Sequence, residues 1–194
     1  MKQRHIGKVF TGMITILWMA IIFAFSAQPA QQSSQISGGV AYRIAEWQSN
    51  LFHLEKTHQE LSAQAEAMQL MIRKGAHMGE YALLAFLLCL HVRYYKAKEI
   101  PNGSLGSAKV FSIVSRVPDI SQILLPVLII TAGYAATDEF HQLFVPGRAG
   151  RLTDVCIDSF GGILGIIFYL ILQRYLPPVL HYIHIKVHHA KGKR

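Results

Sequence analysis

Four apolar runs, each close to the length that an α-helix needs to cross a bilayer, constrain this sequence most. They cover residues 9–27, 77–92, 120–137 and 155–173. Inside hydrocarbon every backbone polar group needs an internal partner, which helices provide. The chain is 52% hydrophobic and only 15% charged, so it is more apolar than most soluble domains. We therefore predict an all-α integral membrane bundle of four transmembrane helices, forming one domain over residues 1–194.

The distribution of positive charge predicts the orientation of this bundle. The net formal charge is +8. The segments on the same side of the membrane as the amino terminus hold most of the cations and only two acids, Glu99 and Asp119. Cytoplasmic segments of membrane proteins are enriched in Lys and Arg, so both termini are predicted to be cytoplasmic, in a bacterial cytoplasmic membrane, with residues 177–194 as a tail. A basic face on a soluble fold is not visible, so nucleic acid is not an expected partner. The cations on that side are Lys2, Arg4, Lys8, Arg93, Lys96, Lys98, Lys109, Arg116, Arg174, Lys186, Lys191, Lys193 and Arg194.

Residues 28–76 form the predicted outer helical loop. After a Gln- and Ser-rich exit, apolar residues recur at spacings of three and four, which is the period of an amphipathic helix. The extracytoplasmic helices would lie on the outer membrane surface, cap the bundle, or form a packed hairpin without a ligand. The residues with this period are Ile36, Val40, Ile44, Trp47, Leu51 and Leu54, and, after a polar break, Leu61, Ala65, Met68 and Ile72.

Ionisable and polar residues gather where three segments reach the outer side of the predicted bundle. Such groups are costly at the edge of a membrane and indicate a functional or structural need. The order of the runs places the start of the second, the end of the third and the start of the fourth at one level, which predicts a polar pocket there. The residues are Lys74, His77, Glu80, Tyr81, Asp138, Glu139, His141, Gln142, Arg148, Arg151, Asp154 and Asp158.

The fourth run carries a stripe of acidic and small residues. Asp154, Asp158, Gly161 and Gly165 follow one another at spacings of four, three and four, so they share one helical face. Small residues allow close helix contact, so this stripe is expected to face neighbouring helices and to hold both carboxylates away from lipid.

These segments resemble the VanZ-like family of small bacterial membrane proteins over nearly the whole chain. The resemblance lies in RKGAHMGEYALLAFLL, in TDEFHQLFVPGRAGRLTDVCIDSFGGILG and in the exit segment FSAQPAQQSSQIS. It implies an association with glycopeptide (teicoplanin) resistance and defines no reaction. Many relatives have Asn where this chain has Asp158. The positions that the resemblance marks are Lys74, His77, Glu80, Tyr81, Asp138, Glu139, Gln142, Arg148, Asp154, Asp158 and Gly161.

The net charge of this polar cluster limits the protonation states in which it can exist. With neutral histidines its acids outnumber Lys74, Arg148 and Arg151, so carboxylates hold protons, histidines are charged, or a cation sits inside. Ion pairs of Glu80 with Arg148 or Lys74, and of Asp154 with Arg148, would fix the helix register.

Two chemical alternatives remain beside that structural one. Glu139 or Glu80 would be a general base, with His77 as proton carrier. A divalent metal would be held by His77, Glu80 and Asp138 or Glu139; this spacing matches no standard site, so we assign no metal ligand and leave the cofactor unknown.

The predicted function is to bind a lipid-linked or anionic envelope component at the outer face of the cytoplasmic membrane, with an effect on glycopeptide susceptibility. Arg148 and Lys74 would hold the anionic head group by charge-assisted bonds, with acids orienting them. The alternatives are an acid/base enzyme acting on an exported lipid head group, and a structural or partner protein whose polar cluster only locks the bundle. The lipid bilayer is the expected partner, and the oligomeric state stays open. The remaining ligand-binding candidates are Tyr81, Asp138, Gln142, Asp154 and Asp158.

Overall fold

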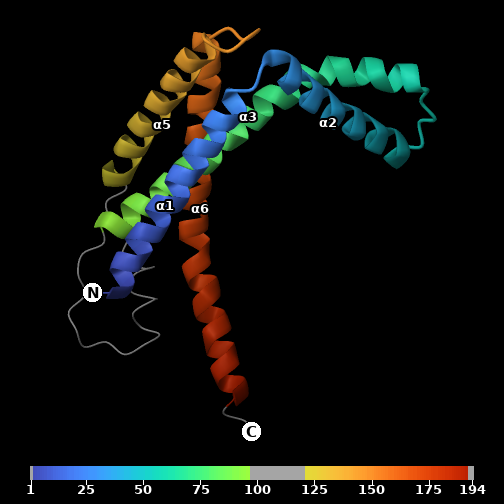
Figure 1. Cartoon of the computed structure of the whole chain (residues 1–194). Helices are drawn as coiled ribbons and strands as arrows, with labels where there is room; N and C mark the ends of the chain where they lie inside the picture. Colours follow the sequence, from blue (N-terminus) through green and yellow to red (C-terminus); the bar gives the residue numbers. More distant parts are fainter. Residues whose placement is uncertain (1, 97–120, 192–194) are drawn as a thin grey trace.

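A computed structural model of the chain describes residues 2–96 and 121–191, with side chains placed for residues 6–93 and 122–175. Within these ranges helices connected by turns and short loops are the only regular secondary structure, which confirms the predicted all-α class (Figure 1). Most of the segment between the second and third runs, with its predicted cytoplasmic cations, and the side chains of the predicted tail lie outside the described residues. The helices are α1 (Lys2–Ser26), α2 (Ala30–Leu51), α3 (His58–Lys96), α5 (Ser121–Gln142) and α6 (Leu152–Lys191).

Four of these helices are long and apolar enough to cross a membrane, so the chain is a multi-pass membrane protein. The spans are Ile6–Ser26, His58–Arg93, Gln122–Gln142 and Leu152–Tyr175. Three of them match the predicted runs within a few residues. The helix that contains the second run begins much earlier than residue 77, because α3 continues without a break from the outer segment into the bundle. Likewise α6 runs on past Pro177 and Pro178 to Lys191.

Helix α3 is the central element of the fold, because it packs against α1, α2, α5 and α6. At 1.5 Å per residue its 39 residues extend about 58 Å, roughly twice the hydrocarbon thickness. Its second half runs through the bundle, while its first half projects beyond it and pairs with α2 (Figure 1). Tyr81 and Leu84 of α3, Val127 of α5 and Ile166 of α6 are all buried in the resulting core.

The projecting arm is a helical hairpin of α2 and the first half of α3. Its contact surface on α2 consists of small residues, Ser37, Ala41, Ala45 and Ser49. The predicted apolar stripe of α2 points outward instead, and Trp47 is 62% exposed. A small-residue face allows the two backbones to approach closely, so it makes the contact although it contributes little apolar area. On α3, Leu61 and Ala65 are buried as their periodicity suggests.

The small-residue stripe of α6 sets the distance between α6 and α3. A Cβ atom at Gly161 would overlap the main-chain carbonyl of Met78, and one at Gly165 would overlap that of Ala82. The two backbones therefore touch without intervening side chains. Asp158 lies on the same face one turn earlier and is buried, as the stripe predicts.

Candidate functional site

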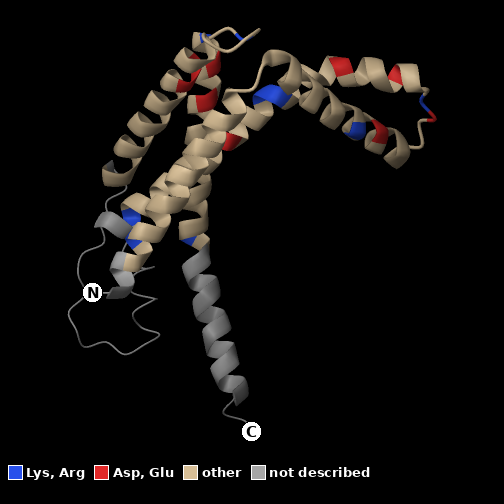
Figure 2. Ribbon diagram, viewed as in Figure 1, with Lys and Arg blue, Asp and Glu red and all other residues tan. Residues whose placement is uncertain are grey.

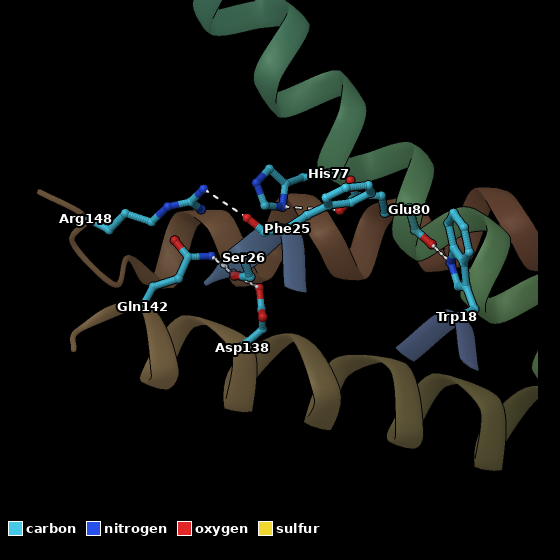
Figure 3. A network of polar contacts seen from close by, with 8 residues as sticks. All are labelled: Trp18, Phe25, Ser26, His77, Glu80, Asp138, Gln142 and Arg148. Carbon is cyan, nitrogen blue, oxygen red and sulfur yellow. Dashed lines mark hydrogen bonds and ion pairs between the residues drawn. The ribbon is translucent and has the colours of Figure 1, made fainter. Parts of the chain in front are cut away.

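The candidate site lies at the end of the bundle where α1 and α5 finish and α6 begins. The middle of α3 passes the same level, so side chains distant in sequence come together there (Figure 3). Two hydrogen bonds to main-chain carbonyls fix α1 against its neighbours. The Trp18 indole donates to Glu80 O on α3 at 2.9 Å, and the Tyr134 hydroxyl of α5 donates to Met19 O at 2.6 Å.

Asp138 anchors the end of α5 to the end of α1. Its Oδ2 accepts hydrogen bonds from the Ser26 hydroxyl at 2.8 Å and from the Gln142 amide at 3.2 Å. The same amide donates to Ser26 Oγ at 2.8 Å, which closes a buried three-membered network (Figure 3). Sequence reasoning assigned Asp138 and Gln142 to the site but missed Ser26. The signal was present, since Ser26 is the polar residue that ends the first apolar run.

Glu139 connects α5 to the start of α6. Its Oε2 accepts a hydrogen bond from the main-chain N–H of Arg151, immediately before α6, at 2.8 Å. The first N–H groups of a helix have no partner within the helix, and a carboxylate there also interacts favourably with the helix dipole. Glu139 thus stabilises the turn between α5 and α6.

His77 forms its ion pair with Glu80, and His77 Nδ1 and Glu80 Oε2 are 3.9 Å apart.

Two basic residues that were predicted to contact ligand have other partners here. Lys74 Nζ forms an ion pair with Asp154 Oδ1 at 3.0 Å, where an Arg148–Asp154 or a Lys74–Glu80 pair had been considered. Arg148 donates from Nε to Gln28 O at 2.9 Å and from its terminal nitrogen to Phe25 O at 3.4 Å. These carbonyls lie at and beyond the end of α1, where cations are favourable. Burial lowers the pKa of Arg148 and the Asp138 carboxylate raises it, but an arginine stays protonated at physiological pH.

A cavity of about 300 Å³ opens between these segments. Four cations, Arg73, Lys74, Arg148 and Arg151, line it together with three acids, Glu139, Asp154 and Asp158. The side chain of Arg151 is exposed. Of the twelve residues predicted for the polar pocket, eight line the cavity: Lys74, His77, Glu139, Gln142, Arg148, Arg151, Asp154 and Asp158. Arg73 is a cavity residue that sequence reasoning passed over, although it stands next to Lys74.

The other four residues predicted for the pocket lie outside the cavity lining: Glu80, Tyr81, Asp138 and His141. Tyr81 is fully buried, and its electrostatic neighbours include Asp138 and Asp158. Ligand atoms of His77, Asp138 and Asp158 all lie within 4.8 Å of one another. This group replaces the metal set considered from sequence, which contained Glu80 and either Asp138 or Glu139 but not Asp158.

Several polar atoms at this depth have no hydrogen-bond partner among the described residues. They include His77 Nδ1, Asp138 Oδ1 and Asp158 Oδ2. Buried polar atoms in folded proteins are nearly always satisfied, so each of these calls for an explanation.

The fold and this polar end define a multi-pass helical membrane protein with a charged cavity at one end of its bundle. Residues 11–173 match the family model VanZ/LLP1, so the chain belongs to the VanZ/LLP1 family. Neither a curated protein nor a solved structure matches it.

Proposed function

We propose that this protein binds the anionic head group of a lipid-linked envelope component in the charged cavity. The observation that carries the proposal is the lining of four cations at one end of a membrane bundle. Charge-assisted hydrogen bonds from Arg and Lys are the usual means of holding phosphate or carboxylate groups. Lys74 is bound only through a partly exposed ion pair, and the Arg151 side chain is exposed, so both are accessible to a ligand.

The surroundings of the cavity suit a ligand with an apolar tail. Large apolar side chains around the turn that precedes α6 are exposed, among them Phe140, Leu143, Phe144 and Leu152. In a membrane protein such side chains face lipid, so a head group in the cavity would keep its chain in hydrocarbon. This supports a lipid-linked ligand over a free soluble anion.

The charge distribution supports placing the cavity at the outer face of a bacterial cytoplasmic membrane. Acidic residues gather at the cavity end of the bundle, and Lys and Arg residues mark the opposite end (Figure 2). By their places in the helices, these basic residues are Lys8 of α1, Arg93 of α3 and Arg174 of α6. The positive end is expected in the cytoplasm. Binding an exported precursor at this level would alter susceptibility to glycopeptides of the teicoplanin type, which act on the envelope.

The direct test measures binding of a polyprenyl phosphate to the purified full-length protein by native mass spectrometry. The double variant Lys74→Gln/Arg151→Gln removes two accessible cations and should bind at least about tenfold more weakly, since one charge-assisted bond contributes roughly 1.5–3 kcal/mol. The matched control is Arg43→Gln, which removes an exposed cation of the arm. Equal binding by all three proteins would contradict the proposal.

The same variants test the effect on cells. Expressed at equal membrane abundance in a sensitive bacterium, the wild type and Arg43→Gln should shift teicoplanin susceptibility, and Lys74→Gln/Arg151→Gln should not. An unchanged shift in the double variant would separate the cellular effect from the cavity.

One observation favours a second candidate, acid/base chemistry on the bound head group. Glu80 stands 3.9 Å from the half-buried His77, and His77 lines the cavity. In such a pair the carboxylate orients the imidazole, which transfers the proton. Mass analysis of polyprenyl phosphate after incubation with the wild type and with His77→Gln decides between the two: conversion by the wild type alone supports chemistry, and recovery of intact probe supports binding.

A further inference from the structure

Three helices bring a metal-binding set of side chains together beneath the charged cavity. His77 comes from α3, Asp138 from α5 and Asp158 from α6, and their ligand atoms lie within 4.8 Å of one another. Ligand bonds to a first-row divalent cation are about 2.0–2.2 Å long, so two ligands of one ion stand at most roughly 4.4 Å apart. A small inward movement of these side chains would therefore complete the geometry.

The two carboxylates of this set are deeply buried and incompletely hydrogen-bonded, which indicates that they need a further partner. Asp138 is 2% exposed and Asp158 is 1% exposed. Both present an oxygen without a hydrogen-bond partner in the described part of the chain. Carboxylates so deeply buried require a cation, a proton or several hydrogen-bond donors.

The nearby basic side chains of Lys74 and Arg148 form their bonds with other groups. Lys74 pairs with Asp154, and Arg148 donates to the carbonyls of Gln28 and Phe25. In the described part of the chain neither forms a hydrogen bond or an ion pair with Asp138 or Asp158, although the charge of Arg148 acts on Asp138 at longer range. This pair of carboxylates is therefore neutralised by a bound cation, by protonation of His77 or by a proton that the two acids hold.

The surroundings have the form of an outer ligand shell. Asp138 Oδ2 is held by Ser26 and Gln142, whereas its Oδ1 has no hydrogen-bond partner among the described residues. Glu80 lies beside the Nδ1 atom of the His77 ring, as carboxylates commonly do beside metal-bound histidines. Such partners orient the side chains that bind a metal directly.

We propose that His77, Asp138 and Asp158 bind a first-row divalent cation of the Zn²⁺ or Mn²⁺ type. One imidazole and two carboxylates suit both ions, whereas an all-oxygen set would suit Ca²⁺ or Mg²⁺ better. His77 and Asp158 also line the cavity, so the open side of the ion faces its interior. The site stands on its own residues and does not depend on head-group binding.

The experiment uses the full-length protein without a polyhistidine tag, with His181, His184, His188 and His189 of the tail replaced by Gln so that the tail contributes no metal. After chelator treatment, Zn²⁺ or Mn²⁺ is added back, and bound metal is measured by mass spectrometry and by calorimetric titration, with Ca²⁺ and Mg²⁺ as comparison ions. We expect one equivalent of Zn²⁺ or Mn²⁺, and a higher melting temperature in its presence.

Two variants and one control identify the ligands. In Asp138→Asn the amide oxygen would keep the bonds from Ser26 and Gln142, so the NH₂ group would face the ion and repel it. Asp158→Asn removes the second charge. Both should weaken binding by more than the roughly 10–100-fold that loss of an outer partner costs. Glu66→Gln, which removes an exposed acid of the arm on α3, should bind as the wild type does.

Three results would overturn the site. They are no uptake of Zn²⁺ or Mn²⁺ by the wild type, equal uptake by Asp158→Asn, and equal loss in Glu66→Gln. The first result would leave protonation of His77 or of the two acids as the means of neutralisation. If Asp138→Asn fails to fold, the metal site is tested by Asp158→Asn and by the metal-dependent shift in the melting temperature of the wild type.

Discussion

Gly161 of α6 lies directly against the main-chain carbonyl of Met78 on α3, so these two helices touch backbone to backbone one turn from Asp158. This contact determines how far Asp158 stands from His77, which lies next to Met78. The glycine therefore positions the candidate site as well as the bundle.

Gly161→Ala should destabilise the protein by about 1–3 kcal/mol, because the added methyl group forces the helices apart. Unfolding in detergent measures this change. Gly79→Ala is the matched control, since nothing lies within 4 Å of a Cβ atom at Gly79 and Ala favours a helix over Gly. Equal effects of the two changes would show that α3 and α6 do not meet as described.

Ser26→Ala should cost about 1–3 kcal/mol of stability, because buried Asp138 loses one of its two donors to Oδ2. Thr137→Ala serves as the control at the same end of the bundle. Its exposed hydroxyl donates only to Tyr134 O within α5, so its loss should stay within about 0.5 kcal/mol. Thermal unfolding at constant detergent compares the two, and a neutral Ser26→Ala would argue against the network.

The Lys74–Asp154 pair should contribute little to stability. The side chains are 36% and 31% exposed, and pairs of this kind couple by about 0.2–1 kcal/mol. A double-mutant cycle with Lys74→Gln and Asp154→Asn measures the coupling, which should fall as salt is added. A coupling well above this range would mean that the pair locks the bundle and does not open for a ligand.

Glu139→Gln should leave the affinity for polyprenyl phosphate unchanged or raise it. The amide oxygen can still accept the Arg151 N–H bond, and one negative charge is removed from a cavity that receives an anion. Stability should fall by about 1 kcal/mol, as a charged acceptor becomes neutral. Native mass spectrometry gives the affinity, and a large loss of binding by a folded variant would contradict the binding role assigned to the cavity.

The orientation is tested with single cysteines in a chain that carries Cys89→Ser and Cys156→Ser. A membrane-impermeant maleimide should label Glu55→Cys, at the turn of the arm, in intact cells. It should label Tyr175→Cys, near the opposite end of the bundle, only after lysis. The reverse pattern would place the cavity in the cytoplasm and remove the exported precursor as ligand.

The four spans and the meeting of their polar ends follow from the sequence, because hydrophobic length fixes the helices and their order fixes which ends are neighbours. The partner of each side chain does not follow. Lys74 pairs with Asp154, and Arg148 caps α1, because helix rotation and the Gly161 contact decide which atoms meet. Periodicity likewise revealed α2 but not its contact face, since Ala41 and Ala45 carry no strong apolar signal.

The unbroken course of α3 links the arm to the cavity mechanically. Gln69 and Arg73 of α3 bond to Ser34 of α2, and His77 follows one turn after Arg73 on the same helix. A tilt of the hairpin against the membrane surface would therefore reach the cavity wall directly, through one continuous helix that carries both Arg73 and His77.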